Sequence, residues 1–73
     1  MFFVIETQAQ TDGTGQALVT TKTDRNEAES EYHRILQFAA ISAVPYHGAI
    51  IVDEECVPIL HKAYDHTEED EDE

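Results

Sequence analysis

The sequence has little of what usually reinforces a small fold. Cys56 is its single cysteine, so an internal disulfide is impossible, and a lone thiol is typical of a reducing compartment. Neither Cys56 nor the four histidines show the short ligand spacing of structural zinc sites. We therefore expect no disulfide, no metal and no cofactor.

Basic residues are also scarce, with four Lys and Arg against sixteen Asp and Glu and a net charge of −12. Nucleic-acid-binding domains carry a basic patch, so direct binding to nucleic acid is not expected. Seven of the sixteen acids lie in "DHTEEDEDE", which leaves nine acids against four bases, a net charge of −5, in the rest of the chain. Like-charge repulsion predicts a disordered acidic tail over residues 65–73, after a single domain over residues 1–64.

The chain has no long hydrophobic run. Its start, "MFFVIE", is apolar but carries no basic leader, so we expect neither a signal peptide nor a membrane span, and a cytoplasmic location. A domain of this size buries only about 60% of its unfolded surface. A core that small supplies roughly 3–5 kcal/mol, so self-association is the expected reinforcement.

Two strand pairs flank a helix in the predicted order. Residues 2–8 and 16–22 are β-favouring, and Asp12-Gly13 between them is a hairpin signal. Residues 48–53 and 56–64 form the second predicted pair. This ββαββ order predicts an α+β fold with one helix packed on a four-stranded antiparallel sheet of order 2-1-3-4, whose apolar first strand is central. Pro58 cannot donate to a strand ladder, which favours an edge position for the last strand.

The helix has a clear start and a predicted end. Asp24 and Glu27 form a capping-box pattern. Apolar residues then recur at steps of three and four, at Ala28, Tyr32, Ile35, Leu36, Ala39 and Ala43. Pro45 disfavours helical geometry at the residue before it, so we expect the helix to end near Ala43.

Both faces of the predicted strands are apolar. In the first strand Phe2 and Val4 alternate with Phe3 and Ile5, whereas a sheet with one wet face alternates apolar with polar residues. We therefore expect the second sheet face to be buried by self-association, as a homodimer or larger assembly that forms through this face or through the helix ends. The residues predicted for this interface are Phe3, Ile5, Phe38, Ile41 and Ile51.

Two Tyr-His pairs, Tyr32-His33 and Tyr46-His47, are candidates for a binding pocket. With Arg34, and with Arg25 or Lys62 of a neighbouring subunit, they would suit a nucleotide or another anionic small molecule. The alternative is structural: Tyr32 belongs to the core stripe and His33 to the helix surface, and Tyr46-His47 opens a strand.

Catalytic chemistry has little support. Cys56 with a histidine is the one conceivable nucleophilic couple, and no motif surrounds it, so we expect no enzyme. The acidic residues offer another interpretation, a negative surface that imitates nucleic-acid charge before a basic protein. The alternative is a tail that only keeps an apolar body in solution.

The stretches "DRNEAESEYHRIL" and "AAISAVPYHGAIIVDEE", with the "FVIE" start, carry a resemblance. Over residues 1–66 the chain resembles a family of short, largely uncharacterised proteins encoded by phages and prophages of Gram-positive bacteria. The resemblance implies an accessory protein of a mobile element that acts in the host cytoplasm. Such a protein would counter host defence by binding or sequestering a host factor or an anionic signal molecule. Two alternatives stay open, an assembly protein that docks through its apolar face and an acidic decoy for a basic host protein.

Overall fold

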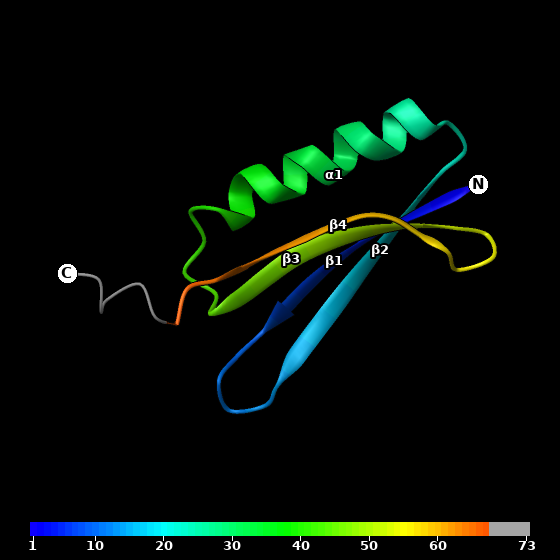
Figure 1. Ribbon diagram of the computed structural model, residues 1–73. Coiled ribbons are helices and arrows are strands. Elements are labelled where there is room, and N and C mark those ends of the chain that lie inside the picture. Colours follow the sequence, from blue (N-terminus) through cyan, green and yellow to red (C-terminus); the bar gives the residue numbers. More distant parts are fainter. Residues whose placement is uncertain (68–73) are drawn as a thin grey trace.

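The computed structural model describes residues 1–67, and over this range the predicted ββαββ order is confirmed. The strands are β1 (Phe2–Ala9), β2 (Gly15–Lys22), β3 (Tyr46–Asp53) and β4 (Pro58–Asp65), and the helix is α1 (Arg25–Ala39). Figure 1 shows α1 lying across one face of the sheet, while no element of the described chain covers the other. The molecule therefore has two layers and one open sheet face.

The sheet has the predicted order β2-β1-β3-β4, with every neighbouring pair antiparallel. Its apolar first strand, β1, is central and pairs with β2 and β3 along its whole length. Pro58 pairs with Val52 on the edge strand β4, where the register between β3 and β4 shifts at Ile51/Val52. A residue without an N–H thus sits beside a ladder irregularity, where its missing hydrogen bond costs least.

The start of α1 follows the predicted capping pattern. Asp24 is the N-cap in an extended conformation, and its carboxylate accepts a hydrogen bond from the Glu27 amide at 3.1 Å. This bond satisfies one of the free amides that every helix start leaves. The turn between β2 and α1 is therefore fixed by a local polar contact.

The end of α1 differs from the prediction, because the helix stops at Ala39 instead of continuing to Ala43. The Ile41 amide donates to Phe38 O at 3.2 Å and the Ser42 amide to Ala39 O at 3.3 Å, so the chain tightens into three-residue turns. The Val44 amide then donates to the Ser42 hydroxyl at 3.0 Å. The helix therefore ends in these three-residue turns, several residues before Pro45.

The core lies between α1 and the two central strands. Its buried side chains are Val4, Ala28, Tyr32, Ile35, Ala39, Ala49 and Ile51. The prediction of Ile51 as an interface residue is wrong. Ile51 pairs with Val4 in the row that faces α1, and neither side chain is exposed to solvent.

The last strand extends past the predicted domain boundary. Asp65 belongs to β4, and the backbone amide of His66 donates to Pro45 O at 2.8 Å. His66 Nε2 also donates to Ala39 O at 2.9 Å, near the end of α1. Ordered structure therefore includes residues 65–67, which were assigned to the acidic tail. The rest of that tail lies outside the described residues, so its disorder stays a prediction. Within the described chain no helix is long and apolar enough to span a membrane.

Candidate functional site

The second predicted Tyr-His pair is divided between the two sides of the sheet. Tyr46 and His47 are neighbours on β3, and neighbouring strand residues point to opposite faces. Tyr46 is 42% exposed on the open side, whereas His47 is 5% exposed on the side that carries α1. Within one copy, these two side chains therefore line different surfaces.

The first pair is also separated, by its place on α1. Tyr32 is buried in the core, and this burial raises the pKa of its hydroxyl, with a further contribution from Tyr64. His33 is exposed and meets the Tyr32 ring edge-on, with 5.3 Å between the ring centroids. The structural interpretation of this pair thus accounts for both residues, and the four aromatic groups do not share one pocket in a single copy.

The predicted cationic ligands are engaged within the chain. Arg25 Nε lies 2.8 Å from Glu29 Oε2. Arg34 donates hydrogen bonds to Glu31 from two of its nitrogens, and its Nε lies 3.1 Å from Glu31 Oε1. The hydrogen bonds between Arg34 and Glu31 raise the pKa of the guanidinium and lower that of the carboxyl. Both arginines therefore already hold a carboxylate in place of an external anion.

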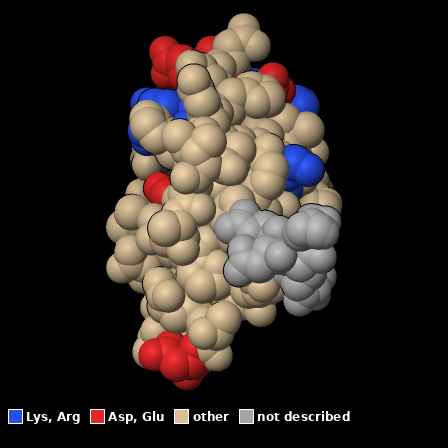
Figure 2. Space-filling model, turned by 90° about the vertical axis from the view of Figure 1, so that its left-hand side faces the viewer, with Lys and Arg blue, Asp and Glu red and all other residues tan. Residues whose placement is uncertain are grey.

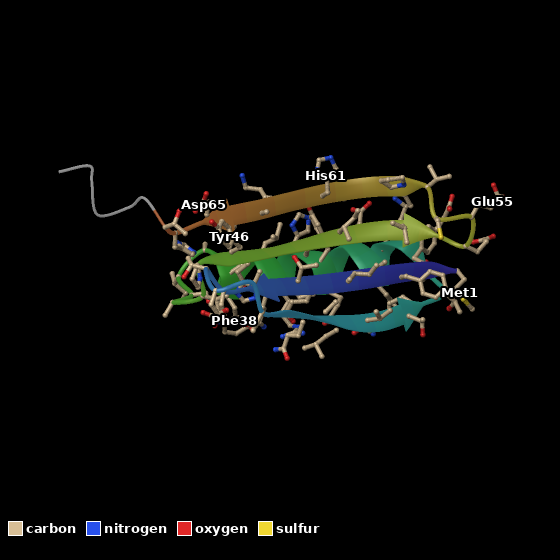
Figure 3. The ribbon with its side chains drawn as sticks, turned by 90° about the horizontal axis from the view of Figure 1, so that it is seen from below. Met1, Phe38, Tyr46, Glu55, His61 and Asp65 are labelled. Carbon is tan, nitrogen blue, oxygen red and sulfur yellow. The ribbon has the colours of Figure 1, made fainter. Side chains whose placement is uncertain are left out.

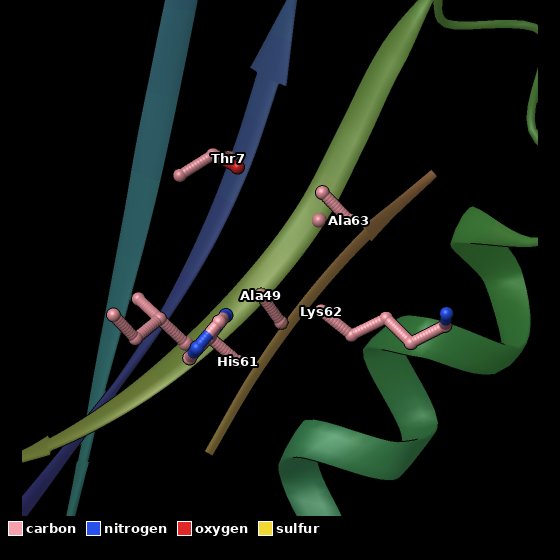
Figure 4. Close-up of a pocket in the computed structure, with 7 residues that line it drawn as sticks. Thr7, Ala49, His61, Lys62 and Ala63 are labelled. Atoms are coloured by element: carbon pink, nitrogen blue, oxygen red, sulfur yellow. The ribbon is translucent and has the colours of Figure 1, made fainter. Parts of the chain in front are cut away.

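Lys62, the remaining predicted cation, projects from the edge strand toward the helix side. Its Nζ atom lies 5.1 Å from the centroid of the Tyr64 ring, within cation–π distance. Figure 4 shows the side chain reaching toward α1. Lys62 is thus also in contact with a neighbour, although it is exposed.

A partly buried polar cluster beside the core was not predicted. His47 Nε2 lies 2.7 Å from Glu6 Oε2, which also accepts a hydrogen bond from Gln8 Nε2 at 3.1 Å. The other ring nitrogen, His47 Nδ1, is buried without a hydrogen-bond partner among the described residues. The sequence did contain one signal, because Glu6 falls in the inward-facing row of β1, where a carboxylate needs a partner.

The open face of the sheet carries the predicted interface residues Phe3 and Ile5. We define this open face by the outward side chains of three successive rows of the sheet: Phe3, Ile5, Thr7, Ala17, Val19, Thr21, Gly48, Ile50, Val52, His61 and Ala63. None of these is Lys, Arg, Asp or Glu, and Asp65 stands one row beyond, opposite Tyr46. Figure 3 looks onto this face, with His61 along its β4 side. An uncharged face of this width is unusual in a chain with a net charge of −12.

The open face is hollowed at one end. Thr7, Gly48, Ile50, His61 and Ala63 line a depression of about 200 Å³, which Figure 4 shows from close by. A Cβ atom at Gly48 would lie 2.7 Å from the Lys62 carbonyl oxygen and 2.8 Å from the Ala63 Cβ. The close approach of β3 and β4 therefore requires glycine here.

Phe38 and Ile41, also predicted for the interface, lie elsewhere. They are 55% and 82% exposed, at the end of α1 and in the turn after it. Figure 2 faces this end of the molecule, where the surface is largely uncharged and the charged side chains lie mostly toward its margins. The predicted interface set thus falls on two surfaces and, for Ile51, in the core.

Residues 1–67 contain no group of three or more His, Cys, Asp or Glu side chains placed to hold a metal ion. No family model, curated protein or solved structure matches this chain. The resemblance to phage and prophage proteins, and the counter-defence role that it implies, therefore stay predictions. The geometry of the chain itself has to support a function.

Proposed function

We propose that this chain is a non-enzymatic, homodimeric binding protein that pairs through its open face and meets a basic partner protein with its acidic outer surface. The observation that carries the proposal is the segregation of charge. The three rows that define the open face have no formally charged side chain, whereas charged side chains of both signs lie on the opposite layer and acids alone lie on the turn between β3 and β4. The acidic outer surface consists of Glu27 on α1 and Asp53, Glu54 and Glu55 around the turn, whereas Glu29 and Glu31 are paired with Arg25 and Arg34.

The size of the open face suits a dimer. Four strands of eight residues span a flat area of about 400–500 Å² per copy, from the usual strand spacing and rise. Side chains make the accessible area larger than this projection, so a face-to-face pair reaches the roughly 1,000 Å² that specific interfaces bury. Pairing also supplies apolar burial that the chain itself lacks, since only seven hydrophobic residues are buried within residues 1–67.

The acidic outer surface favours a basic protein over a small anion. Long-range attraction between opposite charges speeds the encounter of two proteins. An anionic small molecule would instead have to displace Glu29 from Arg25 or Glu31 from Arg34. The sequestering alternative therefore has less support than the protein-binding one.

Two neighbouring residues of β2 provide a matched test of the dimer. Val19 is 58% exposed on the open face, and Leu18 is 54% exposed on the other side of the same strand. We expect the wild type and Leu18→Lys to sediment as dimers and Val19→Lys as a folded monomer, with folding checked by circular dichroism. A monomeric wild type at all concentrations, or a dimeric Val19→Lys, would overturn the dimer.

Photo-crosslinking in the producing cell tests the partner. A photoreactive amino acid at position 19 is expected to link two copies of the chain. The same amino acid in place of Glu54, an exposed acid of the β3–β4 turn, is expected to link the chain to a different, basic protein. If position 54 yields only self-linked or unlinked chain, the basic partner is excluded while the dimer stands.

A further inference from the structure

The open face is uneven along the strand direction. Its middle row consists of Val19, Ile5, Ile50 and His61. The row on one side is bulkier and contains Thr21, Phe3 and Val52. The row on the other side is small and contains Ala17, Thr7, Gly48 and Ala63, around the hollow. The face is therefore raised on one side of the middle row and hollow on the other, and Tyr46 and Asp65 stand one row beyond the hollow.

Two faces of this shape can be related by a two-fold axis in either of two directions. An axis along the strands would place each row against the same row of the second copy. Phe3 would then face the bulky row of Thr21, Phe3 and Val52, and the two hollows would face each other. An axis across the strands, along the middle row, would exchange the outer rows and place Phe3 against Thr7, and Val52 against Gly48, of the second copy. Packed interfaces avoid voids, which favours the second direction.

We infer that two copies pair about a two-fold axis that crosses the strands at Ile5 and Ile50, so that Phe3 and Val52 of each copy fit over Thr7 and Gly48 in the hollow of the other. This inference rests on the proposed dimer and adds its geometry. A cavity of about 150 Å³ holds a benzene molecule, so a hollow of about 200 Å³ accommodates a phenyl ring. The face is thereby complementary to a second copy of itself.

The arrangement predicts which residues meet across the interface. Val19 and His61 lie on the axis. Val19 therefore faces Val19 of the second copy at the β2 edge of the pair, and His61 faces His61 of the second copy at the β4 edge. With the axis along the strands, β2 would lie over β4, and His61 would instead face Val19. The two edge strands are three strand spacings apart, about 14 Å, so a crosslinker shorter than this separates the two arrangements.

The first test uses single cysteines and a short bismaleimide in a Cys56→Gly background, since Cys56 is an exposed free thiol. The His61→Cys variant alone and the Val19→Cys variant alone are each expected to give crosslinked dimers. When the two variants are mixed, a crosslink between His61→Cys and Val19→Cys is expected only at the level of random contact. A mixed product that dominates would overturn the inferred axis but leave the dimer intact. A chain that yields no linked product and sediments as a monomer would overturn the dimer as well.

The second test fills the hollow. Thr7→Leu is expected to raise the dimer dissociation constant about tenfold, because overpacked sites reject a well-fitted partner. Thr21→Leu adds similar bulk in the opposite row, facing the small Ala17, and is expected to change the constant less than threefold. The double variant Phe3→Ala/Thr7→Leu, which removes the inserted ring, is expected to recover part of the loss. Equal effects of Thr7→Leu and Thr21→Leu would count against the seating of Phe3 in the hollow.

Discussion

Glu6 and His47 meet on the face of the sheet that carries α1, where His47 Nε2 lies 2.7 Å from Glu6 Oε2. Only 6% of the histidine side chain and 20% of the carboxylate side chain are exposed. Because a carboxylate accepts hydrogen bonds only, Nε2 carries the proton and donates it. This contact ties the central strands β1 and β3 together beside the apolar core, and its removal should leave a buried polar group without a partner.

A double-mutant cycle measures this contact. Glu6→Ala should lower the free energy of unfolding by about 1–3 kcal/mol, since the His47 N–H then loses its acceptor in a buried site. His47→Phe removes the donor, and the double variant Glu6→Ala/His47→Phe should cost less than the sum of the two single changes. Urea unfolding, followed by circular dichroism, measures the free energy of unfolding of the wild type, the two single variants and the double variant. Additive losses would show that the two side chains do not stabilise each other.

The fold was predictable because several local signals agree. The hairpin at Asp12-Gly13, the cap at Asp24 and the alternation of apolar residues together define the ββαββ order and the position of β1. The face that each strand residue occupies was harder to assign, because both faces are apolar. Ile51 was therefore misplaced, and only its pairing with Val4 under α1 shows that it belongs to the core.

The candidate site was less predictable than the fold. The bond between Glu6 and His47 joins residues 41 positions apart, and no local pattern encodes such a contact. The hollow at Gly48 depends on the approach of β4 to β3, which is visible only in three dimensions. The end of α1 was misjudged because Pro45 is a strong signal, whereas the three-residue turns at Ile41 and Ser42 that end the helix have no comparable signal in the sequence.

The ion pair between Glu31 and Arg34 predicts a pH dependence. Hydrogen bonds from Arg34 lower the pKa of Glu31 below its ordinary value of 4.5. The stabilisation is therefore fully present above that value and is lost as the pH falls through the lower pKa of the folded state. Glu31→Gln should lower the free energy of unfolding by less than about 1 kcal/mol at neutral pH, because Arg34 is largely exposed.

Urea titrations of the wild type and Glu31→Gln across the acid range measure this difference in stability. The difference in the free energy of unfolding between the two proteins should shrink as the pH falls below 4.5 and approaches the pKa of folded Glu31. Glu29→Gln is a useful comparison, since Glu29 meets Arg25 through a single bond on the same helix. A gap that persists in acid would mean that Glu31 acts through packing rather than through its charge.

Cys56 predicts a stabilising substitution. Its φ of 65° places it in the left-handed region, which costs a side-chain-bearing residue about 1–2 kcal/mol. The turn holds this conformation because the Cys56 amide donates to Asp53 O at 2.9 Å, and the Asp53 carboxylate accepts from the Val57 amide at 3.0 Å. Cys56→Gly should therefore raise the melting temperature, while Cys56→Val should lower it. A lower melting temperature for Cys56→Gly than for the wild type would contradict this account of the turn.

The acids at the end of the chain predict a salt-dependent dimer. Removal of residues 68–73 deletes six acids and changes the net charge from −12 to −6. Two copies then repel each other less, so the truncated chain should dimerise several-fold more tightly than the full chain at low salt. At about 1 M salt the Debye length falls to roughly 3 Å, and the two constants should converge. A full-length variant with these six acids changed to Gln or Asn separates charge from length: it should match the truncated chain in sedimentation equilibrium. If it instead matches the wild type, the repulsion of the tail charges does not limit dimerisation.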